Sequence, residues 1–169
     1  MSKMFQQNLE EHRELFARLE PLAAPIERAA AMIATALAAG RKLMLCGNGG
    51  SAADSQHLAA EFTGRFIKDR RPLAALALST DTSALTCIAN DFSFDEVFSR
   101  QVLGLGAAGD CLLAISTSGN SRNVLRAVEA ARDLGAHTIG LLGRDGGQLA
   151  ALCELAVIVP SKTTARIQE

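Results

Sequence analysis

The sequence predicts an α/β domain with a doubly wound, five-stranded parallel sheet, preceded by a pair of helices. Five short apolar runs recur after residue 40 and alternate with stretches of helical periodicity. Apolar strands that alternate with helices are typical of a parallel sheet covered on both faces. The chain has 169 residues, 49% hydrophobic and 21% charged. That length is enough for one domain with a full core and too short for two ordinary ones.

Residues 1–40 are predicted to form a helical extension to this core. A break between Pro21 and Pro25 separates two helices, and Gly40 caps the second one. The apolar stripe of this pair is expected to pack either on the sheet or on a partner chain. On the first helix, the stripe is formed by Phe5, Leu9, Phe16 and Leu19.

The remaining elements follow in strict alternation. The predicted strands are Leu43–Cys46, Ala74–Leu78, Cys111–Ile115, Thr138–Leu142 and Leu155–Val159. The predicted helices are 51–66, 82–90, 94–105, 121–135 and 146–152. Ligands of such sheets bind at the carboxyl ends of the strands, so the turns that follow the strands are the candidate site.

Charge and aromatic content exclude some functions. The 17 basic and 18 acidic residues give a net charge of −1, which excludes a generally basic nucleic-acid binder. The chain has no Trp and no Tyr, so a base-stacking platform is not expected. We therefore expect no nucleic-acid partner.

The four cysteines, Cys46, Cys87, Cys111 and Cys153, are far apart and each has apolar neighbours. Buried free thiols in a reducing compartment are expected. The N-terminal residues lack the apolar segment of a signal peptide. The longest Ala-rich run, 29–40, is shorter than the roughly 20 residues that a membrane span needs. The sequence therefore predicts a cytoplasmic protein without a membrane partner.

Two strand-to-helix turns are rich in glycine and hydroxyl groups: Cys46-Gly47-Asn48-Gly49-Gly50-Ser51 and Ser116-Thr117-Ser118-Gly119-Asn120-Ser121. Glycine permits a sharp turn close to a ligand, and the next helix offers free N–H groups and the positive end of its dipole. This pattern predicts an anion cradle for phosphate. For the first turn an alternative stays open, in which Ser51 only caps the helix and Asp54 completes a capping box.

The turns do not match common nucleotide sites. Gly47-x-Gly49-x-x-Ala52 resembles a dinucleotide fingerprint, but its acidic ribose partner should follow about 20 residues later. Asp81, the nearest candidate at a strand end, lies 34 positions after Gly47. No Gly-Lys-Ser/Thr sequence is present, which excludes a P-loop. Hydroxyl turns without a lysine suit the monoester phosphate of a small sugar.

Further polar residues accompany the turns. His57 and Glu61, four apart on one helix, share a face and are able to bind a divalent metal, with Glu61 also a candidate general base. Alternatively, they form an ordinary solvated pair. Asn90 and Asp91 offer contacts to sugar hydroxyls, or simply end a helix.

Several motifs together resemble bacterial phosphoheptose isomerases of the sugar isomerase (SIS) domain superfamily. The resemblance runs from about residue 5 to the last residue. The motifs are Cys46 to Asp54 with Gln56-His57, Glu61, Thr63 to Phe66, Thr80 to Thr86, Asn90-Asp91, Ile115 to Ser121 and Thr164 to Glu169.

The resemblance implies a single SIS domain, 1–169, of flavodoxin-like fold. It implies isomerisation of sedoheptulose 7-phosphate to D-glycero-D-manno-heptose 7-phosphate through an enediol, for the heptose of lipopolysaccharide. It also implies a homotetramer with active sites at subunit interfaces, and zinc. Carried over by motif, Ser51, Ser116, Thr117, Ser118 and Ser121 hold the phosphate; Asn48, Gly49, Gly50, Asn90, Asp91 and Gln168 contact substrate; Glu61 moves the proton; His57, Glu61 and Gln168 bind the metal.

One motif of the family is incomplete. The family carries a catalytic, metal-binding histidine eight positions after the residue that matches Gln168, whereas this sequence ends at Glu169. We therefore expect a truncated C-terminal helix and weak or no turnover by the 169 residues alone. The alternative function is a non-catalytic SIS adaptor similar to the replication-initiator-associating protein. The glutamate at position 61, which that adaptor lacks, favours the enzyme. A sugar-phosphate sensor would need a DNA-binding module, for which 169 residues leave no room.

Overall fold

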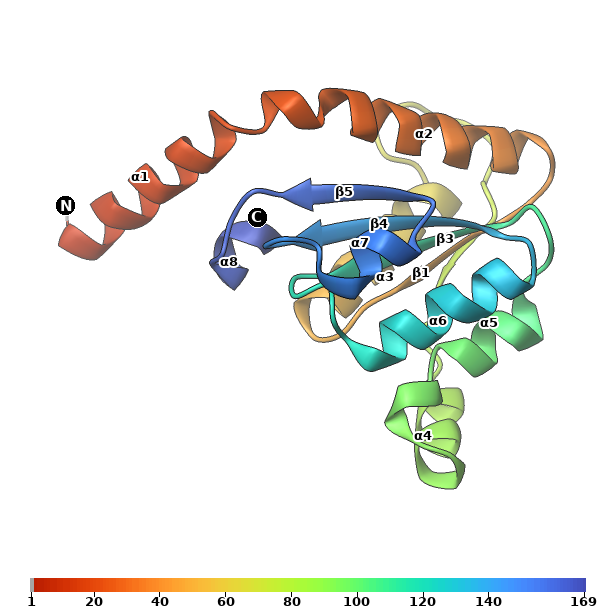
Figure 1. Ribbon diagram of the computed structural model, residues 1–169. Helices are drawn as coiled ribbons and strands as arrows, with labels where there is room; N and C mark the ends of the chain where they lie inside the picture. Colours follow the sequence, from red (N-terminus) through yellow and green to blue (C-terminus); the bar gives the residue numbers. More distant parts are fainter. Residues whose placement is uncertain (1) are drawn as a thin grey trace.

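The computed structural model describes residues 2–169 and contains the predicted parallel sheet (Figure 1). Its strands are β1 (Leu43–Cys46), β2 (Ala75–Ala77), β3 (Cys111–Ser116), β4 (His137–Gly143) and β5 (Leu155–Val159). They pair in parallel in the order β2-β1-β3-β4-β5. The order reverses between β1 and β3, which is where doubly wound folds bind their ligands. The five strands and the flavodoxin-like fold class are therefore confirmed.

Helices cover both faces of the sheet. They are α1 (Lys3–Phe16), α2 (Ala23–Ala38), α3 (Gly50–Thr63), α4 (Thr82–Asp91), α5 (Ser99–Leu105), α6 (Arg122–Asp133), α7 (Gly147–Leu152) and α8 (Thr164–Gln168), with short 3-10 turns at Glu20–Leu22 and Phe94–Glu96. Val102 of α5, Val124 of α6 and Leu149 of α7 are buried in the core on one face. On the other face, Ala36 of α2 and Ala59 of α3 pack against β1.

Two predicted helices have different ends. The stretch predicted as 94–105 splits into a 3-10 turn and α5, and the Ser99 hydroxyl donates to the backbone oxygen of Glu96 at the break. Helix α3 ends at Thr63, three residues before the predicted end. The Arg70 guanidinium donates to the backbone oxygens of Glu61 and Phe62 at 2.7 and 2.8 Å. Arg70 thereby satisfies carbonyl groups that the end of a helix leaves free.

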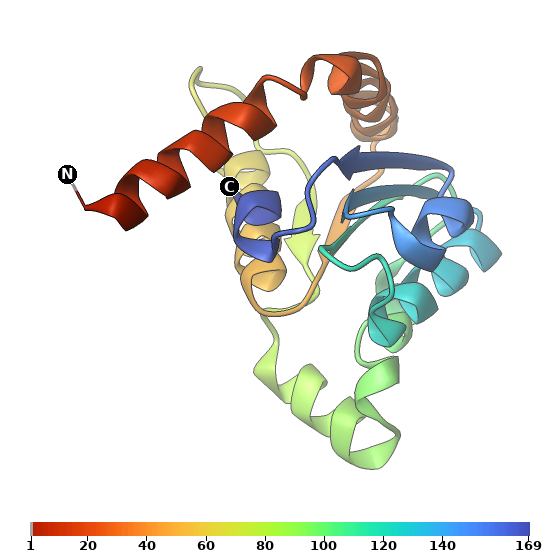
Figure 2. The ribbon, with the colours of Figure 1, turned by 60° about the vertical axis from the view of Figure 1, so that its left-hand side comes forward.

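The two N-terminal helices differ in how they pack against the sheet. Figure 1 shows α2 lying along the sheet, whereas α1 extends away from it, and Figure 2 confirms this from a second direction. Phe5, Leu9 and Phe16 of the predicted stripe are exposed, and Leu15 is the buried residue of α1. Of the two positions expected for the helix pair, packing on the sheet is therefore wrong for the first helix and confirmed for the second.

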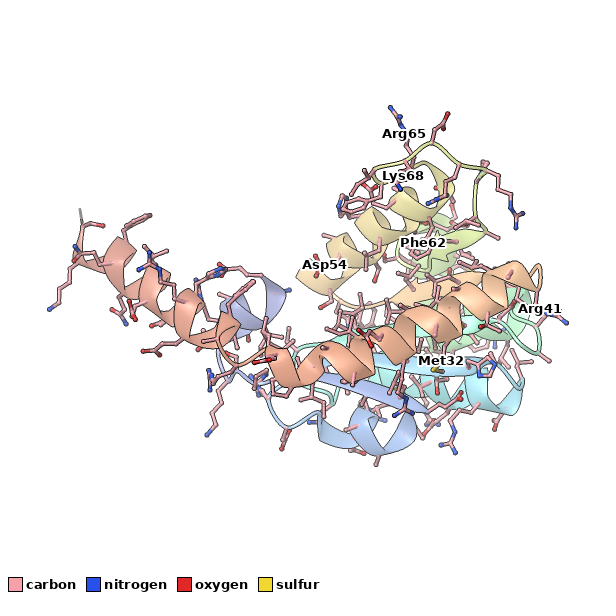
Figure 3. All side chains as sticks on the ribbon, turned by 90° about the horizontal axis from the view of Figure 1, so that it is seen from above. Met32, Arg41, Asp54, Phe62, Arg65 and Lys68 are labelled. Carbon is pink, nitrogen blue, oxygen red and sulfur yellow. The ribbon has the colours of Figure 1, made fainter. Side chains whose placement is uncertain are left out.

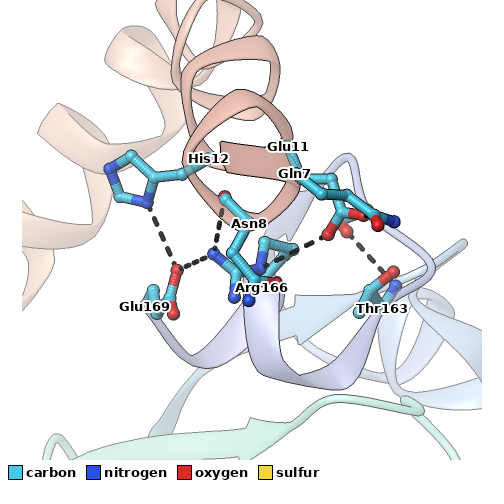
Figure 4. Close-up of polar contacts among 8 residues, drawn as sticks. Gln7, Asn8, Glu11, His12, Thr163, Arg166 and Glu169 are labelled. Carbon is cyan, nitrogen blue, oxygen red and sulfur yellow. Dashed lines mark hydrogen bonds and ion pairs between the residues drawn. The ribbon is translucent and has the colours of Figure 1, made fainter. Parts of the chain in front are cut away.

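Helix α1 contacts the rest of the chain through α8 (Figure 4). The Arg166 guanidinium donates to the backbone oxygen of Asn8 at 3.4 Å and to the Glu169 carboxylate at 2.6 Å. The His12 ring lies 3.2 Å from the same carboxylate. These contacts join the first and last helices of the described chain.

An apolar groove of about 740 Å³ remains between α2 and α3 over the sheet. In Figure 3, seen from above, Met32 marks α2 and Phe62 marks α3. Ile33, Phe62 and Leu113 line the groove, so this face is less completely covered than the opposite one.

One buried carboxylate lies at the amino-terminal edge of the sheet, where the strands begin. Asp110, before β3, is 1% exposed and accepts hydrogen bonds from the Lys42 ammonium (2.6 Å), the Lys42 backbone N–H (3.0 Å) and the Ala107 N–H (2.8 Å). Burial alone would raise the pKa of Asp110, but these bonds and the lysine charge lower it below its ordinary value.

Three cysteines are buried free thiols, as expected, but Cys87 is exposed on α4. Its thiol donates to the Asp91 carboxylate at 3.4 Å, and this contact raises the pKa of Cys87. The prediction failed there because Cys87 lies on the exposed face of α4, the helix that projects from the body (Figure 1), whereas Leu85, Ile88 and Ala89 of the same helix pack against the core. Within residues 2–169, no helix has both the length and the hydrophobicity to cross a membrane.

Candidate active site

The first turn places Ser51 at the carboxyl end of β1. Helix α3 begins at Gly50, its N-cap is Gly49 with φ +57°, and no side chain caps it. Ser51 is 4% exposed, and its backbone oxygen accepts from the Ser55 hydroxyl at 2.8 Å. The capping-box interpretation of Ser51 and Asp54 is therefore wrong, because the backbone of Gly49 takes the cap position.

The second turn, residues 116–121, is organised by its own hydroxyl groups. Ser116 Oγ lies 3.1 Å from Ser121 Oγ and accepts from the Gly119 N–H at 3.2 Å. Gly119 has φ +66°, and a side chain there would collide with the backbone of Gly146. This position requires glycine for its conformation and for the close approach of a neighbouring loop. The turn is thus a compact cluster of hydroxyls at the N-terminus of α6.

A pair of side-chain amides connects the two turns. Asn48 Nδ2 donates to Asn123 Oδ1 at 2.9 Å, and Asn123 Nδ2 donates to Asn48 Oδ1 at 2.8 Å. Asn123 belongs to the first turn of α6 and is 3% exposed. The N-termini of α3 and α6 are therefore held side by side, and together they present N–H groups and hydroxyls to one place.

A cavity of about 270 Å³ joins the first turn to two of the three predicted metal ligands, while the third, Glu61, is not among its lining residues. Ser51 and Thr117 line it together with His57 of α3 and Gln168 of α8. A Cβ atom on Gly50 would collide with the Gln168 amide, so glycine at position 50 lets this side chain approach α3. The structure thus brings four of the predicted site residues into one cavity.

His57 and Glu61 lie on one face of α3. His57 Nε2 and Glu61 Oε1 are 3.9 Å apart, and their side chains are 72% and 28% exposed. The described residues contain no group of three or more His, Cys, Asp or Glu side chains that would hold a metal ion. Within this chain, a metal at this position has one imidazole, one carboxylate and the Gln168 amide as available ligands.

Asn90 and Asp91 are not brought to this cavity by their own chain. They end α4, which projects from the body in both views (Figures 1 and 2). Asn90 Nδ2 donates to Asp91 Oδ1 at 2.8 Å, and both residues are exposed. Hydrogen bonds from Asn90 and from Cys87 lower the pKa of Asp91.

A second cavity, of about 800 Å³, adjoins the second turn at Ser118. Arg18, Arg144 and Lys162 line it with the carboxylates of Glu11 and Glu14. Although it is the larger of the two cavities, none of the predicted metal ligands lines it. The smaller cavity at Ser51 and His57 is therefore the better candidate for the reacting part of a ligand.

Two site residues were not assigned from the sequence. Asn123 occupies a buried position in the apolar stripe of α6, which also contains Val124 and Val128. A polar residue in an apolar stripe is a recognisable indication of a specific partner. Asp54, interpreted above only as part of a cap, lines the cavity beside His57. Its position three residues before His57 on α3 was the available indication.

Comparisons with known proteins agree with this geometry. The family model of the SIS domain matches residues 7–143. The phosphoheptose isomerase of Aliarcobacter butzleri is 55% identical over 159 residues, which cover 94% of this chain and 84% of that protein. The structure of the phosphoheptose isomerase from Neisseria gonorrhoeae has 49% identity and a TM-score of 0.86, with 98% of this chain and 86% of that chain covered.

A second solved structure is even closer in shape. The phosphoheptose isomerase from Francisella tularensis is 35% identical, with a TM-score of 0.93, and 99% of this chain and 91% of that chain are covered. The matched regions include both turns, α3 and α8. With its SIS-type sheet, its paired hydroxyl turns and these relatives, the chain belongs to the phosphoheptose isomerase family of SIS-domain proteins.

Proposed function

We propose that this protein is an aldose–ketose isomerase that converts sedoheptulose 7-phosphate to D-glycero-D-manno-heptose 7-phosphate, a precursor of lipopolysaccharide heptose. One observation carries the proposal: a single cavity contains hydroxyls suited to phosphate, Ser51 and Thr117, and the imidazole of His57. Glu61 lies 3.9 Å from that imidazole. The family to which the chain belongs supports the same reaction. The adaptor alternative is not favoured, because its relative lacks the glutamate that is present here.

In this proposal, the phosphate lies between the two turns. Its ligands are the hydroxyls of Ser51, Ser116, Thr117, Ser118 and Ser121 and the free N–H groups of α3 and α6. Neutral donors and two helix N-termini stabilise a dianion without a lysine in either turn. Binding the remote phosphate in this way positions the reacting carbons, which lie at the opposite end of the substrate.

Glu61 acts as the base in the reaction. Its carboxylate takes a proton from C1 of the ketose, and the electron pair of the C–H bond forms the C1–C2 double bond while the π pair of the C2–O2 carbonyl moves to O2, which takes up a proton from solvent to give the enediol. O1 then gives its proton to solvent and forms the C1–O1 double bond of the aldehyde, and the π pair between C1 and C2 takes the proton back from Glu61 at C2. Asn48, Gly49, Gly50, Asn90 and Asp91 are the proposed contacts to the sugar.

We propose zinc as the cofactor, with His57, Glu61 and Gln168 as ligands from this chain. The imidazole and the carboxylate fit a divalent ion, because they share one helix face, and Gln168 lines the same cavity as His57. When bound, zinc would stabilise the negative charge that develops on the substrate oxygen. Metal analysis of the purified protein checks this, and a protein that binds no divalent metal would contradict it.

We further propose a homotetramer with active sites at subunit interfaces. Asn90 and Asp91 stand on the projecting α4, so a second copy is a way to bring them to a cavity. Phe5, Phe16 and Ile26 are at least half exposed along α1 and α2, where a second copy would cover them. Sedimentation at micromolar concentration checks the assembly, and a monomer would contradict it.

A cytoplasmic location is the last part of the proposal. It is supported by the four free cysteines, because thiols persist in reducing compartments. Cell fractionation checks it, and recovery of the protein from the periplasm would contradict it.

The test of the reaction is Glu61→Gln. Glutamine keeps the shape of the side chain but does not accept the proton, so we expect turnover to fall about 10³-fold. Sugar-phosphate affinity should stay within about tenfold, because most binding contacts come from the two turns. Heptose 7-phosphate formation and a binding isotherm are measured on the same variant. The same assay is run on a longer chain that includes the family's C-terminal histidine, because the family resemblance gives that histidine a catalytic role.

The matched control is Glu10→Gln, on the exposed surface of α1, which should leave turnover unchanged. Turnover of Glu61→Gln within tenfold of the starting enzyme would remove Glu61 from the catalytic role. Sugar-phosphate binding without turnover by the longer enzyme would favour the adaptor.

A further inference from the structure

The two phosphate turns are joined by the reciprocal amide pair of Asn48 and Asn123, with bonds of 2.9 and 2.8 Å. We propose that this pair is a clamp that fixes the gap between the turns, so that Asn123 is a positioning residue for the phosphate. The Asn48 side chain then acts through Asn123, so the contact to the sugar proposed above for Asn48 is made by its backbone. The inference rests on the proposed phosphate site and adds a residue and a role to it.

The pair fits a structural clamp because each amide uses both its donor and its acceptor on the other. Asn48 lies in the loop between β1 and α3, and Asn123 lies in the first turn of α6, 75 positions later. Asn123 is 3% exposed. Two parallel hydrogen bonds between planar groups define both distance and orientation, whereas a single bond leaves rotation free. In this arrangement, the amide of Asn48 is directed at α6.

The other hydrogen bonds of the two turns lie within each turn or lead to other elements: Asn120 Oδ1, for example, accepts from the Gln148 N–H at 3.1 Å, and the Gly119 backbone oxygen accepts from the Leu149 N–H at 3.0 Å. Ser116 Oγ contacts Ser121 Oγ, and Ser118 Oγ accepts from the Asn120 N–H. On the first turn, the Ser51 N–H donates to the Asn48 backbone oxygen at 3.0 Å. Among residues 2–169, the hydrogen bonds that pass between the two turns are those of the amide pair. Beneath the pair, the β1–β3 ladder places Cys46 opposite Ala114, and a Cβ atom on Gly47 would collide with the backbone oxygen of Ile115.

A clamp is needed because the two helix N-termini carry the same sign of partial charge. The positive ends of α3 and α6 repel one another, and before phosphate binds there is no anion between them. Neutral amides hold the ends together without neutralising them. A preorganised gap favours phosphate binding, because the two turns then need not be ordered at the expense of binding free energy.

The test is a double-mutant cycle with inorganic phosphate as the probe. Affinity is measured by titration calorimetry for the starting protein, Asn48→Ala, Asn123→Ala and the double variant. A clamp predicts that each single variant loses about tenfold in affinity and that the double variant loses about the same, because either change removes the whole pair. Independent ligands would instead give losses that multiply to about 100-fold.

The exposed Asn8→Ala on α1 is the matched control and should bind phosphate like the starting protein. Thermal unfolding is recorded for each variant, because a purely structural role would lower the melting temperature without this pattern of affinities. If Asn123→Ala does not fold, Asn123→Asp, which keeps the shape and one of the two hydrogen bonds, takes its place in the cycle. Losses that multiply, or an Asn123 variant with unchanged affinity, would overturn the clamp.

Steady-state kinetics separate this inference from the proposed reaction. In an active longer chain, Asn123→Ala should raise KM for sedoheptulose 7-phosphate about tenfold and leave kcat within about threefold, because Glu61 is not disturbed. A kcat that falls as much as KM rises would overturn the positioning role. If the longer chain gives the affinities that the clamp predicts for the four variants and still shows no turnover, that result contradicts the proposed isomerase reaction and leaves the clamp supported.

Discussion

The two edges of the sheet carry polar groups of different kinds. At the amino-terminal edge, Asp110 is ionised and buried, and three donors from Lys42 and Ala107 surround it. At the carboxyl-terminal edge, Ser51, Ser116 and Thr117 are neutral, and Ser51 and Thr117 line an open cavity. A polar group whose partners are all within the protein contributes to stability. A polar group that faces a cavity keeps its capacity for a ligand. The comparison predicts that substitutions at the amino-terminal edge lower the stability of the fold, whereas substitutions at the carboxyl-terminal edge lower the affinity for phosphate.

The largest effect is expected from Asp110→Ala. The variant leaves the Lys42 ammonium and two backbone N–H groups without their acceptor, which should lower the free energy of unfolding by about 3 kcal/mol. Phosphate affinity should stay within about twofold, because the cavity lies at the opposite edge. Urea unfolding and calorimetry measure both quantities. Asp69→Ala, at an exposed loop position, is the control. If Asp110→Ala lost as much free energy of phosphate binding as free energy of unfolding, the two edges would not have separate effects.

A smaller effect, on binding, is expected from Ser116→Ala. It removes the side-chain acceptor of the Gly119 N–H, which keeps the Ser116 backbone oxygen at 3.3 Å, and it removes the contact with Ser121, so phosphate affinity should fall about tenfold, equivalent to about 1.4 kcal/mol. The free energy of unfolding should change by about 1 kcal/mol. The control is Ser99→Ala, a buried serine on α5, which should bind phosphate normally. Equal affinities for Ser116→Ala and the starting protein would place the phosphate elsewhere.

The smallest effect is expected on pH dependence. Because the pKa of Asp110 is lowered in the folded state, its contribution to stability is present above the ordinary aspartate pKa and is lost as pH falls through the folded value. The difference in unfolding free energy between the starting protein and Asp110→Asn should therefore shrink from pH 6 to pH 3. Denaturant titrations at four pH values measure it. A difference that stays constant over this range would show that the carboxylate charge is not responsible.

The sheet and both turns were predictable because they depend on local patterns. Apolar runs such as Cys111–Ile115 and the turn from Ser116 to Ser121 can be recognised in a short window of sequence. The capping-box alternative for α3 stayed open in the sequence and is wrong in the structure, because serine and glycine both suit an N-cap and only the backbone decides between them. The exposure of Cys87 depends on which face of α4 packs against the core, and that is decided by tertiary contacts rather than by the residues next to it.

The amide pair was the part of the site that sequence reasoning missed. Asn48 and Asn123 are 75 positions apart, and their pairing depends on the order of strands β1 and β3 in the sheet. Asn90 and Asp91 show the opposite case, in which a motif is recognised in the sequence but its place in the assembled site is not. Their motif was recognisable in the sequence, but the single chain does not bring them to the cavity. Motifs indicate which residues matter, whereas topology and assembly determine which of them meet.

The contact between α1 and α8 has a consequence for the order of folding. His12 and Glu169 are 157 positions apart, so their contact closes a loop of nearly the whole described chain. Such a contact has a high entropic cost and forms after the local elements between its ends. During synthesis on the ribosome, α1 emerges before α8 and gains this partner only after the elements between them have been made. Until then, Phe5 and Phe16 belong to a helix that has no docking surface on its own chain, and chaperones or a second copy meet it first.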